Sequence, residues 1–270
     1  MSKGKDLVQE ILAAEYPEQG AAMWWLSQMG LVVKGAGKIC SIDCFLTDME
    51  SRLVPPVIAA EEFSFPDFII GTHDHADHID HDLWKTAAKL SDAKFVIPAY
   101  FIDELPQILG IEAGRFIGIR AGETTELCEG ITVTGLAEAH EFLDYNEEKD
   151  EFPYLGYLLD INGYRILHCG DCCNYEGFIS RILKLGHIDM MMLPISGRDA
   201  YRYTHNCIGN MTYQEAVDVA GFVKPDIAVP GHYDMFRGNT EDPEKFREYM
   251  SVKYPNQKVW IGKPGDRITV

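Results

Sequence analysis

The chain has 270 residues, of which 46% are hydrophobic and 24% charged, and its formal net charge is −18 at pH 7. This composition is typical of a globular protein with a substantial core, and we expect a single domain over residues 1–270 because no linker-like segment divides it. The acidic balance argues against nucleic acid or an anionic membrane as partner, and no apolar run is long enough to span a bilayer.

Helical and strand periodicities alternate along the whole chain. The expected helices cover residues 6–16, 79–90, 100–109, 175–185, 214–222 and 243–254. The expected strands cover residues 22–26, 31–34, 39–43, 68–71, 94–98, 115–119, 130–136, 154–161, 164–168, 188–194, 226–229, 258–261 and 267–270. Residues 44–66 and 196–210 are expected to be loops, the first of them overhanging the site. This order favours an α+β fold with two sheet-and-helix halves packed sheet to sheet.

Potential metal ligands follow four of these strands. The densest group is His73-x-His75-x-Asp77-His78, and the other strand ends supply His140, Asp171 and His232. Imidazole and carboxylate groups suit zinc, manganese or iron, and their number favours a catalytic site with open coordination positions. The alternative, a polar loop in which Asp77 caps the following helix, needs one such side chain and not this cluster.

The spacing groups these residues into two neighbouring sites. We expect one divalent ion at His73, His75 and His140, a second at Asp77, His78 and His232, and Asp171 between them. Two such ions can hold a hydroxide, which is the nucleophile of a hydrolase. Asp77 and Asp171 are the candidate catalytic carboxylates, while Asp43 either hydrogen-bonds a ligand histidine or starts a turn. His81, His168 and His187 are interpreted as structural.

The ordered set His73-x-His75-x-Asp77-His78, His140, Asp171 and His232, with Asp43 after an early strand, resembles the metallo-β-lactamase superfamily. The resemblance implies an αββα four-layer sandwich. Within the superfamily, the segments 22–26 and 72–80 and the Gly170-Asp171 turn are most similar to the L-ascorbate-6-phosphate lactonase group. That similarity implies a cytoplasmic, homo-oligomeric enzyme that uses manganese or a similar ion to open the lactone of a phosphorylated sugar acid.

Substrate contacts are expected from the polar aromatic loop after residue 194 and from the residue after His232. The candidates for binding a small anionic substrate are Arg198, Tyr201, Arg202, His205 and Tyr233. The alternative functions are a metal-dependent phosphodiesterase of the same fold and, more remotely, a non-catalytic oligomeric protein. Iron redox chemistry is disfavoured because His75 and His78 stand where such proteins carry acidic ligands.

The cysteines point to a reducing compartment. There are seven of them, an odd number, and no signal peptide precedes them, which favours a cytoplasmic location. Cys169, Cys172 and Cys173 include a Cys-x-x-Cys spacing, but the sequence offers no second pair to complete a metal site. We interpret them as small buried apolar side chains, and a role for Cys172 and Cys173 beside Asp171 stays open.

Overall fold

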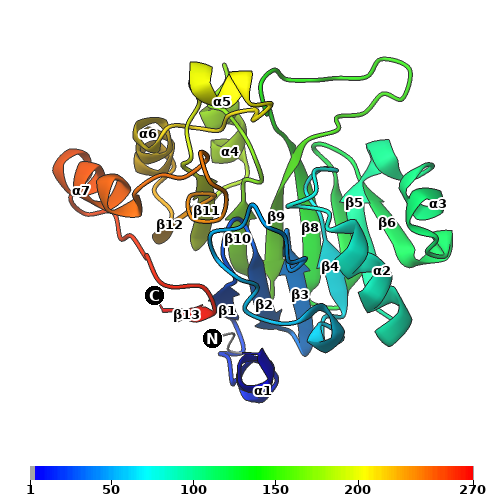
Figure 1. Ribbon diagram of the computed structural model, residues 1–270. Coiled ribbons are helices and arrows are strands. Elements are labelled where there is room, and N and C mark those ends of the chain that lie inside the picture. Colours follow the sequence, from blue (N-terminus) through cyan, green and yellow to red (C-terminus); the bar gives the residue numbers. More distant parts are fainter. Residues whose placement is uncertain (1–3, 270) are drawn as a thin grey trace.

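The computed structural model describes residues 4–269, in which two β-sheets pack against each other and helices cover their outer faces (Figure 1). In this part of the chain the first sheet has seven strands, in the order β13-β1-β2-β3-β4-β5-β6, and the second has six, in the order β12-β11-β10-β9-β8-β7. The predicted αββα sandwich is therefore confirmed.

The bounds of the elements are as follows. The strands of the first sheet are β1 (Ala22–Trp25), β2 (Leu31–Gly35), β3 (Lys38–Ile42), β4 (Phe68–Ile70), β5 (Lys94–Pro98), β6 (Phe116–Ile119) and β13 (Asp266–Ile268). Those of the second are β7 (Thr124–Cys128), β8 (Ile131–Ala137), β9 (Leu155–Ile161), β10 (Tyr164–His168), β11 (Met190–Pro194) and β12 (Ile227–Gly231). The α-helices are α1 (Gly4–Ala13), α2 (His81–Leu90), α3 (Leu105–Leu109), α4 (Phe178–Lys184), α5 (Ala200–Thr204), α6 (Tyr213–Val223) and α7 (Pro243–Lys253).

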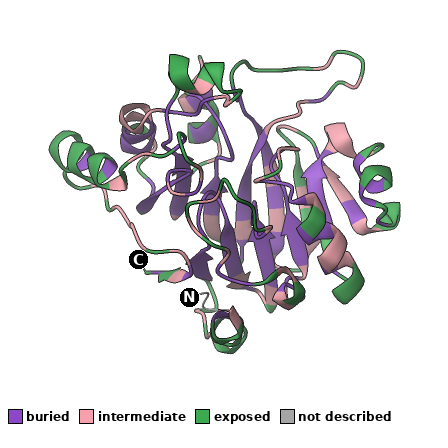
Figure 2. Cartoon of the chain, viewed as in Figure 1, coloured by how far each residue is buried: buried purple, intermediate pink, exposed green. Residues whose placement is uncertain are grey.

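Two apolar clusters hold the layers together, and Figure 2 shows the strands almost entirely buried between more exposed helices. The larger cluster joins side chains of both sheets, such as Val33 of β2 and Leu159 of β9. The second lies between the first sheet and its helices and contains Leu7 of α1 and Trp84 of α2. Burial of such large side chains contributes about 1.5–3 kcal/mol each, which makes sheet packing the main source of stability.

Strand direction decides where the loops gather. Strands β3, β4, β5 and β6 run parallel to one another, and so do β10, β11 and β12. Parallel strands place their carboxyl ends at the same edge of a sheet, so the segments that follow β3, β4, β10 and β12 emerge together. Strands β8 and β10 both run antiparallel to β9 and therefore point in the same direction. Strand β8 thus also ends at this edge.

Some elements differ from the sequence-based expectation. The half-exposed strand β7 was not expected, because its five residues alternate weakly between faces. Residues 258–261 form no regular strand and pair with the second sheet through one bridge, between Val259 and Ala228. The expected loop at 196–210 contains the short helix α5, and α2 is capped by Asp80, whose carboxylate accepts a hydrogen bond from Leu83 N. Val270, expected in the last strand, lies outside the described residues.

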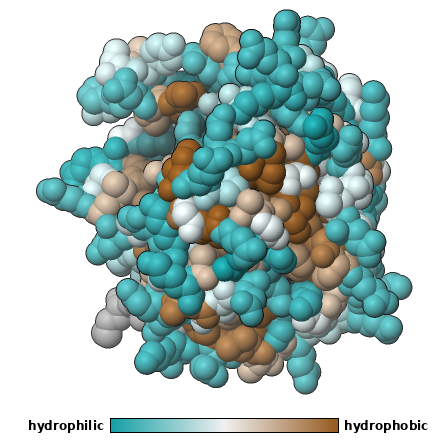
Figure 3. Space-filling model, turned by 90° about the vertical axis from the view of Figure 1, so that its right-hand side faces the viewer, coloured by the Kyte–Doolittle hydropathy of each residue, from teal (hydrophilic) through white to brown (hydrophobic). Residues whose placement is uncertain are grey.

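The outer surface is mixed in character. The face shown in Figure 3, on the side of α2 and α3, carries small apolar areas between hydrophilic side chains. Leu90 of α2 and Ile108 of α3 are among the large apolar side chains that are exposed. Over residues 4–269, every helix is too short or too polar to cross a membrane.

Candidate metal centre

The seven predicted ligands meet at the edge where strands of both sheets end. His73, His75, Asp77 and His78 follow β4 in the first sheet, whereas His140, Asp171 and His232 follow β8, β10 and β12 in the second. The two halves touch here: Leu155 N donates a hydrogen bond of 3.1 Å to Thr72 O. Gly170, at φ +52°, lies so close to Thr72 that a Cβ at this position would fall 2.9 Å from Thr72 Oγ1. A glycine is therefore needed for the sheets to approach this closely.

His73, His75 and His140 form the first group. One ring nitrogen from each lies within 4.8 Å of the others, and His73 Nε2 and His75 Nδ1 are 3.0 Å apart. Burial lowers the pKa of all three imidazoles, and the neighbouring histidines His78 and His140 lower those of His73 and His75 further. These rings are consequently neutral near pH 7, which is the state that binds a metal.

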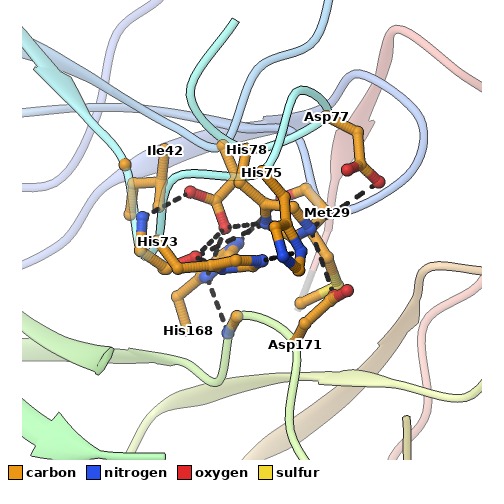
Figure 4. Close-up of polar contacts among 12 residues, drawn as sticks. Met29, Ile42, His73, His75, Asp77, His78, His168 and Asp171 are labelled. Atoms are coloured by element: carbon orange, nitrogen blue, oxygen red, sulfur yellow. Dashed lines mark hydrogen bonds and ion pairs between the residues drawn. The ribbon is translucent and has the colours of Figure 1, made fainter. Parts of the chain in front are cut away.

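Asp77, His78 and His232 form the second group, again with ligand atoms within 4.8 Å of one another. Asp171 lies between the groups, with carboxylate oxygens 3.1 Å from His232 Nε2, 3.2 Å from His78 Nε2 and 3.5 Å from His140 Nε2. Figure 4 shows Asp171 approaching the histidine cluster from the opposite side to Asp77.

Charge pairing dominates the second group. Burial opposes ionisation of both Asp77 and Asp171, but His78 and His232 outweigh it and lower the pKa of each carboxyl. Burial likewise opposes protonation of the two imidazoles, and Asp171 outweighs it, raising the pKa of His78 strongly and that of His232 to about 9. A cation, whether a proton or a metal ion, is favoured at this position.

Asp43 orients the cluster through its contacts with Thr72 and His78. Its carboxylate accepts hydrogen bonds from Thr72 N at 2.9 Å and Thr72 Oγ1 at 2.7 Å, and lies 2.7 Å from His78 Nδ1. This contact leaves His78 Nε2 as the atom that faces the centre. His168 lies near the same carboxylate. Its Nε2 bonds to Met29 O at 2.8 Å, which supports the structural role expected for this histidine.

The donor set fits a metal ion. Two nitrogens bound to one tetrahedral zinc at about 2.0–2.1 Å lie about 3.3 Å apart, close to the 3.0 Å between His73 Nε2 and His75 Nδ1. Without an ion, two neutral imidazoles would face each other in a buried site where each also contacts further histidines. Oxygen and nitrogen ligand atoms from both sheets converge there.

A cavity of about 420 Å³ opens above the candidate ligands. Of the predicted substrate contacts, Tyr201, Arg202 and His205 line it. Arg198 and Tyr233 do not. The guanidinium of Arg198 makes hydrogen bonds of 2.6 and 2.7 Å to Glu215, and Tyr233 stacks on Trp25 with ring centroids 5.2 Å apart.

The loop over residues 44–66 packs against the wall of this cavity. Leu53 N donates a hydrogen bond of 2.7 Å to Met235 O, and Phe45 packs on Phe236, which is part of the cavity wall. Residues 44–66 are not among those that line the cavity, and the contacts of this loop run to the segment that follows His232.

The structure also places at the site residues that the sequence did not single out. Arg237 lines the cavity, Tyr154 packs its ring 5.4 Å from those of His73 and His140, and Gln28 contacts Asp77 and His232. Arg237 carried one available signal, its closeness to the strand end that delivers His232, whereas Tyr154 directly precedes β9, which supplies no ligand. Gln28 lies in a tight turn between two early strands, where nothing in the sequence marks it.

Comparison with known proteins agrees with this geometry. Residues 40–233 match the family model of the beta-lactamase superfamily domain. A UPF0173 metal-dependent hydrolase from Archaeoglobus fulgidus is 30% identical over 248 residues, which cover 90% of this chain and 96% of that protein. Another from Thermoplasma acidophilum is 34% identical over 206 residues, covering 76% and 80% respectively.

Solved structures show the same fold. Igni18, a metallo hydrolase from Ignicoccus hospitalis, has 22% sequence identity and a TM-score of 0.71, with 92% of this chain and 97% of that chain covered. An isothiocyanate hydrolase from Delia radicum gut bacteria has 15% identity and a TM-score of 0.71, with 92% and 99% covered. The matched domain and the full-length relatives together establish that this chain belongs to the metallo-β-lactamase superfamily and is a metal-dependent hydrolase.

Proposed function

We propose that this hydrolase opens the lactone of a small phosphorylated sugar acid and uses two divalent ions, manganese or zinc, to do so. The observation that carries the proposal is the cavity of about 420 Å³, which has the His/Asp cluster on one side and cationic side chains on the other. A lactone presents both an electrophilic carbonyl for the cluster and, on the sugar acid, an anionic group for the cations.

The chain's own residues divide the work. His73, His75 and His140 would hold one ion, and Asp77, His78 and His232 the other, with Asp171 shared. Bound ions lower the pKa of a coordinated water from 15.7 to about 7 and polarise an oxygen of the substrate. The Asp77 carboxylate, which His78 keeps ionised, would orient the attacking water and accept its proton.

Arg237 is the residue best suited to bind the anionic group. It lines the cavity, and among residues 4–269 it has no ion pair that would occupy its guanidinium. Arg202 is committed elsewhere, because Nε donates to Asn239 Oδ1 at 3.1 Å, Nη2 donates to Thr240 O at 2.9 Å, and Nη1 pairs with Asp199. Arg202 would therefore shape the wall beside Arg237, whereas Arg237 itself can form a bidentate contact with phosphate.

The test is turnover by metal-stripped protein reloaded with manganese or zinc. L-Ascorbate 6-phosphate, unphosphorylated L-ascorbate and bis(4-nitrophenyl) phosphate would be compared, with metal-free protein as the blank. We expect metal-dependent opening of the phosphorylated lactone and much weaker opening of the unphosphorylated one. Cleavage of the phosphodiester alone would reject the lactonase proposal in favour of a phosphodiesterase with the same centre.

A further inference from the structure

We propose that Gln28 is a positioning residue for the ion at Asp77, His78 and His232, and that its carboxamide determines how tightly this ion, and not its neighbour, is held. The inference rests on the proposed two-ion centre. It assigns a task to a residue of the first sheet that supplies no expected ligand.

The backbone of Gln28 is fixed by the loop that delivers His232. Gln28 lies in the turn between β1 and β2 at φ +54°. Its N–H donates to Asp234 Oδ1 at 3.0 Å, and its carbonyl oxygen accepts from His232 N and from Trp25 Nε1, each at 3.0 Å. The turn and the loop after β12 therefore hold each other in place, although they are more than two hundred residues apart in the chain.

The side chain reaches the ligand atoms themselves. Gln28 Nε2 lies 2.8 Å from Asp77 Oδ2 and 2.9 Å from His232 Nε2, and the residue is completely buried. Its Oε1 is also buried and has no hydrogen-bond partner among the described residues. A buried amide oxygen without a partner costs about 1–3 kcal/mol, and a role at the site explains why such a residue is kept there.

Asp77 is the most exposed ligand of the second group, so it gains most from a hydrogen bond that fixes it. Its side chain is 19% exposed, while that of Asp171 is 5% exposed and that of His78 is fully buried. The hydrogen bond from Gln28 Nε2 to Asp77 Oδ2 restricts the orientation of this carboxylate beside His78 and His232. Hydrogen bonds to metal ligands from outside the coordination sphere typically change metal affinity by about 10–100-fold.

The first group has no contact with Gln28. Of its three rings, that of His73 is oriented by Thr72, whose Oγ1 lies 3.0 Å from His73 Nδ1. Loss of the Gln28 carboxamide should therefore weaken one ion and spare the other. A general loss of structure would weaken both, so the asymmetry separates the two explanations.

The experiment is a titration of metal-free protein with manganese or zinc alone, followed by calorimetry or by competition with a chromophoric chelator. Gln28→Asn keeps an amide and a residue that tolerates positive φ but is too short to reach Asp77, and Gln28→Met fills the space without polar atoms. Gln107→Met is the matched control, because Gln107 is exposed on α3 and its side chain donates one hydrogen bond, to Asp103 O at 3.1 Å.

We expect both Gln28 variants to bind one ion with wild-type affinity and the other about 10–100-fold more weakly, and the control to match the wild type. Activity on any accepted substrate should return when the metal concentration is raised. Wild-type affinity for both ions in the variants, or equal weakening of both, would overturn the role of Gln28. If the wild type bound only one ion, the two-ion premise itself would be rejected. The metal titration shows this without any substrate assay.

Discussion

At the level of single residues, Asp43 shows how one buried carboxylate fixes several parts of the centre. It accepts two hydrogen bonds from Thr72 and contacts His78 Nδ1 at 2.7 Å, in a position with no solvent exposure. From the sequence alone, this residue could either orient a ligand or only begin a turn. Its contact with His78 supports the first interpretation, and its φ of +47° shows that it also lies at a sharp bend.

Replacing Asp43 should therefore affect both metal binding and folding. We expect Asp43→Ala to weaken metal binding about 10–100-fold and to lower the free energy of unfolding by about 1–3 kcal/mol, because Thr72 N loses its buried acceptor. Metal titration and urea unfolding would measure the two effects. Asp67→Ala, which removes the pair of Asp67 with Lys38 at the far end of the strands, is the control and should leave metal affinity unchanged.

Arg237 allows a test of substrate recognition that is separate from metal binding. We expect Arg237→Ala to raise KM for an anionic substrate about tenfold or more while metal content stays at the wild-type level, because the guanidinium lines the cavity without contacting the cluster. Steady-state kinetics and metal analysis would be run together. Arg247→Ala, on α7 and paired with Glu244, is a suitable control, and an unchanged KM in Arg237→Ala would remove this residue from the anion site.

At the level of secondary structure, the start of α6 combines a helix cap with an ion pair. Thr212 and Glu215 form a reciprocal capping box, and Glu215 also binds the guanidinium of Arg198. Burial raises the pKa of Glu215, but the hydrogen bonds from Arg198 and Thr212 outweigh this and lower it below the usual value. A carboxyl whose pKa is lowered in the folded state adds stability above its unfolded pKa and loses it as the pH falls through the folded pKa.

Glu215→Gln should expose this pH dependence. The variant keeps an acceptor for the cap but loses the charge, so we expect about 0.5–1 kcal/mol lower stability at neutral pH. The difference from the wild type should shrink as the pH falls through the lowered pKa of Glu215 and disappear below it. Urea unfolding across this range measures it, and a difference that persists in acid would show that the charge is not responsible.

Elements with strong periodicity could be predicted from the sequence, and weaker ones could not. The Asn162-Gly163 turn joins β9 and β10 as expected, and the buried strands β4 and β11 are continuous apolar runs. Strand β7 lies at a sheet edge and is partly exposed to solvent, so the alternation of apolar and polar residues along it is weak. Helix α5 has five residues and gains its start from the Asp199 cap, which is too short a signal to separate from a polar loop.

The same distinction applies to the site. Ligands that directly follow apolar strands could be grouped from strand order alone, since parallel strands end at one edge. Arg198 and Arg202 could not be ranked against Arg237, because side-chain pairing decides which guanidinium is free, and Glu215 and Asp199 occupy the first two. The position of Gln28 at the site could not be predicted, because it depends on which turn packs against which loop, and that is a property of the tertiary structure.

For the whole molecule, the centre joins two sheets, and bound ions should therefore stabilise the fold. A ligand at one hundred times its Kd adds about 2.7 kcal/mol, which in a chain of this size raises Tm by roughly 5–10 °C. We expect removal of metal by a chelator to lower Tm by about this amount, and added manganese or zinc to restore it. His140→Ala should show a smaller shift, and an unchanged Tm on metal removal would contradict a site that spans both sheets.

The position of the ligands in the chain also bears on the order of assembly. His73, His75, Asp77 and His78 lie within six consecutive residues, whereas His140, Asp171 and His232 arrive from three distant points. A newly made or denatured chain thus carries a short chelating segment before either sheet exists. Ions captured by this segment would reduce the thermodynamic gain from metal, since the unfolded state binds it too. The same ions would already be bound when the second sheet packs onto the first. The rate of refolding in the presence of metal can therefore differ from the rate at which protein refolded without metal takes up ions added later.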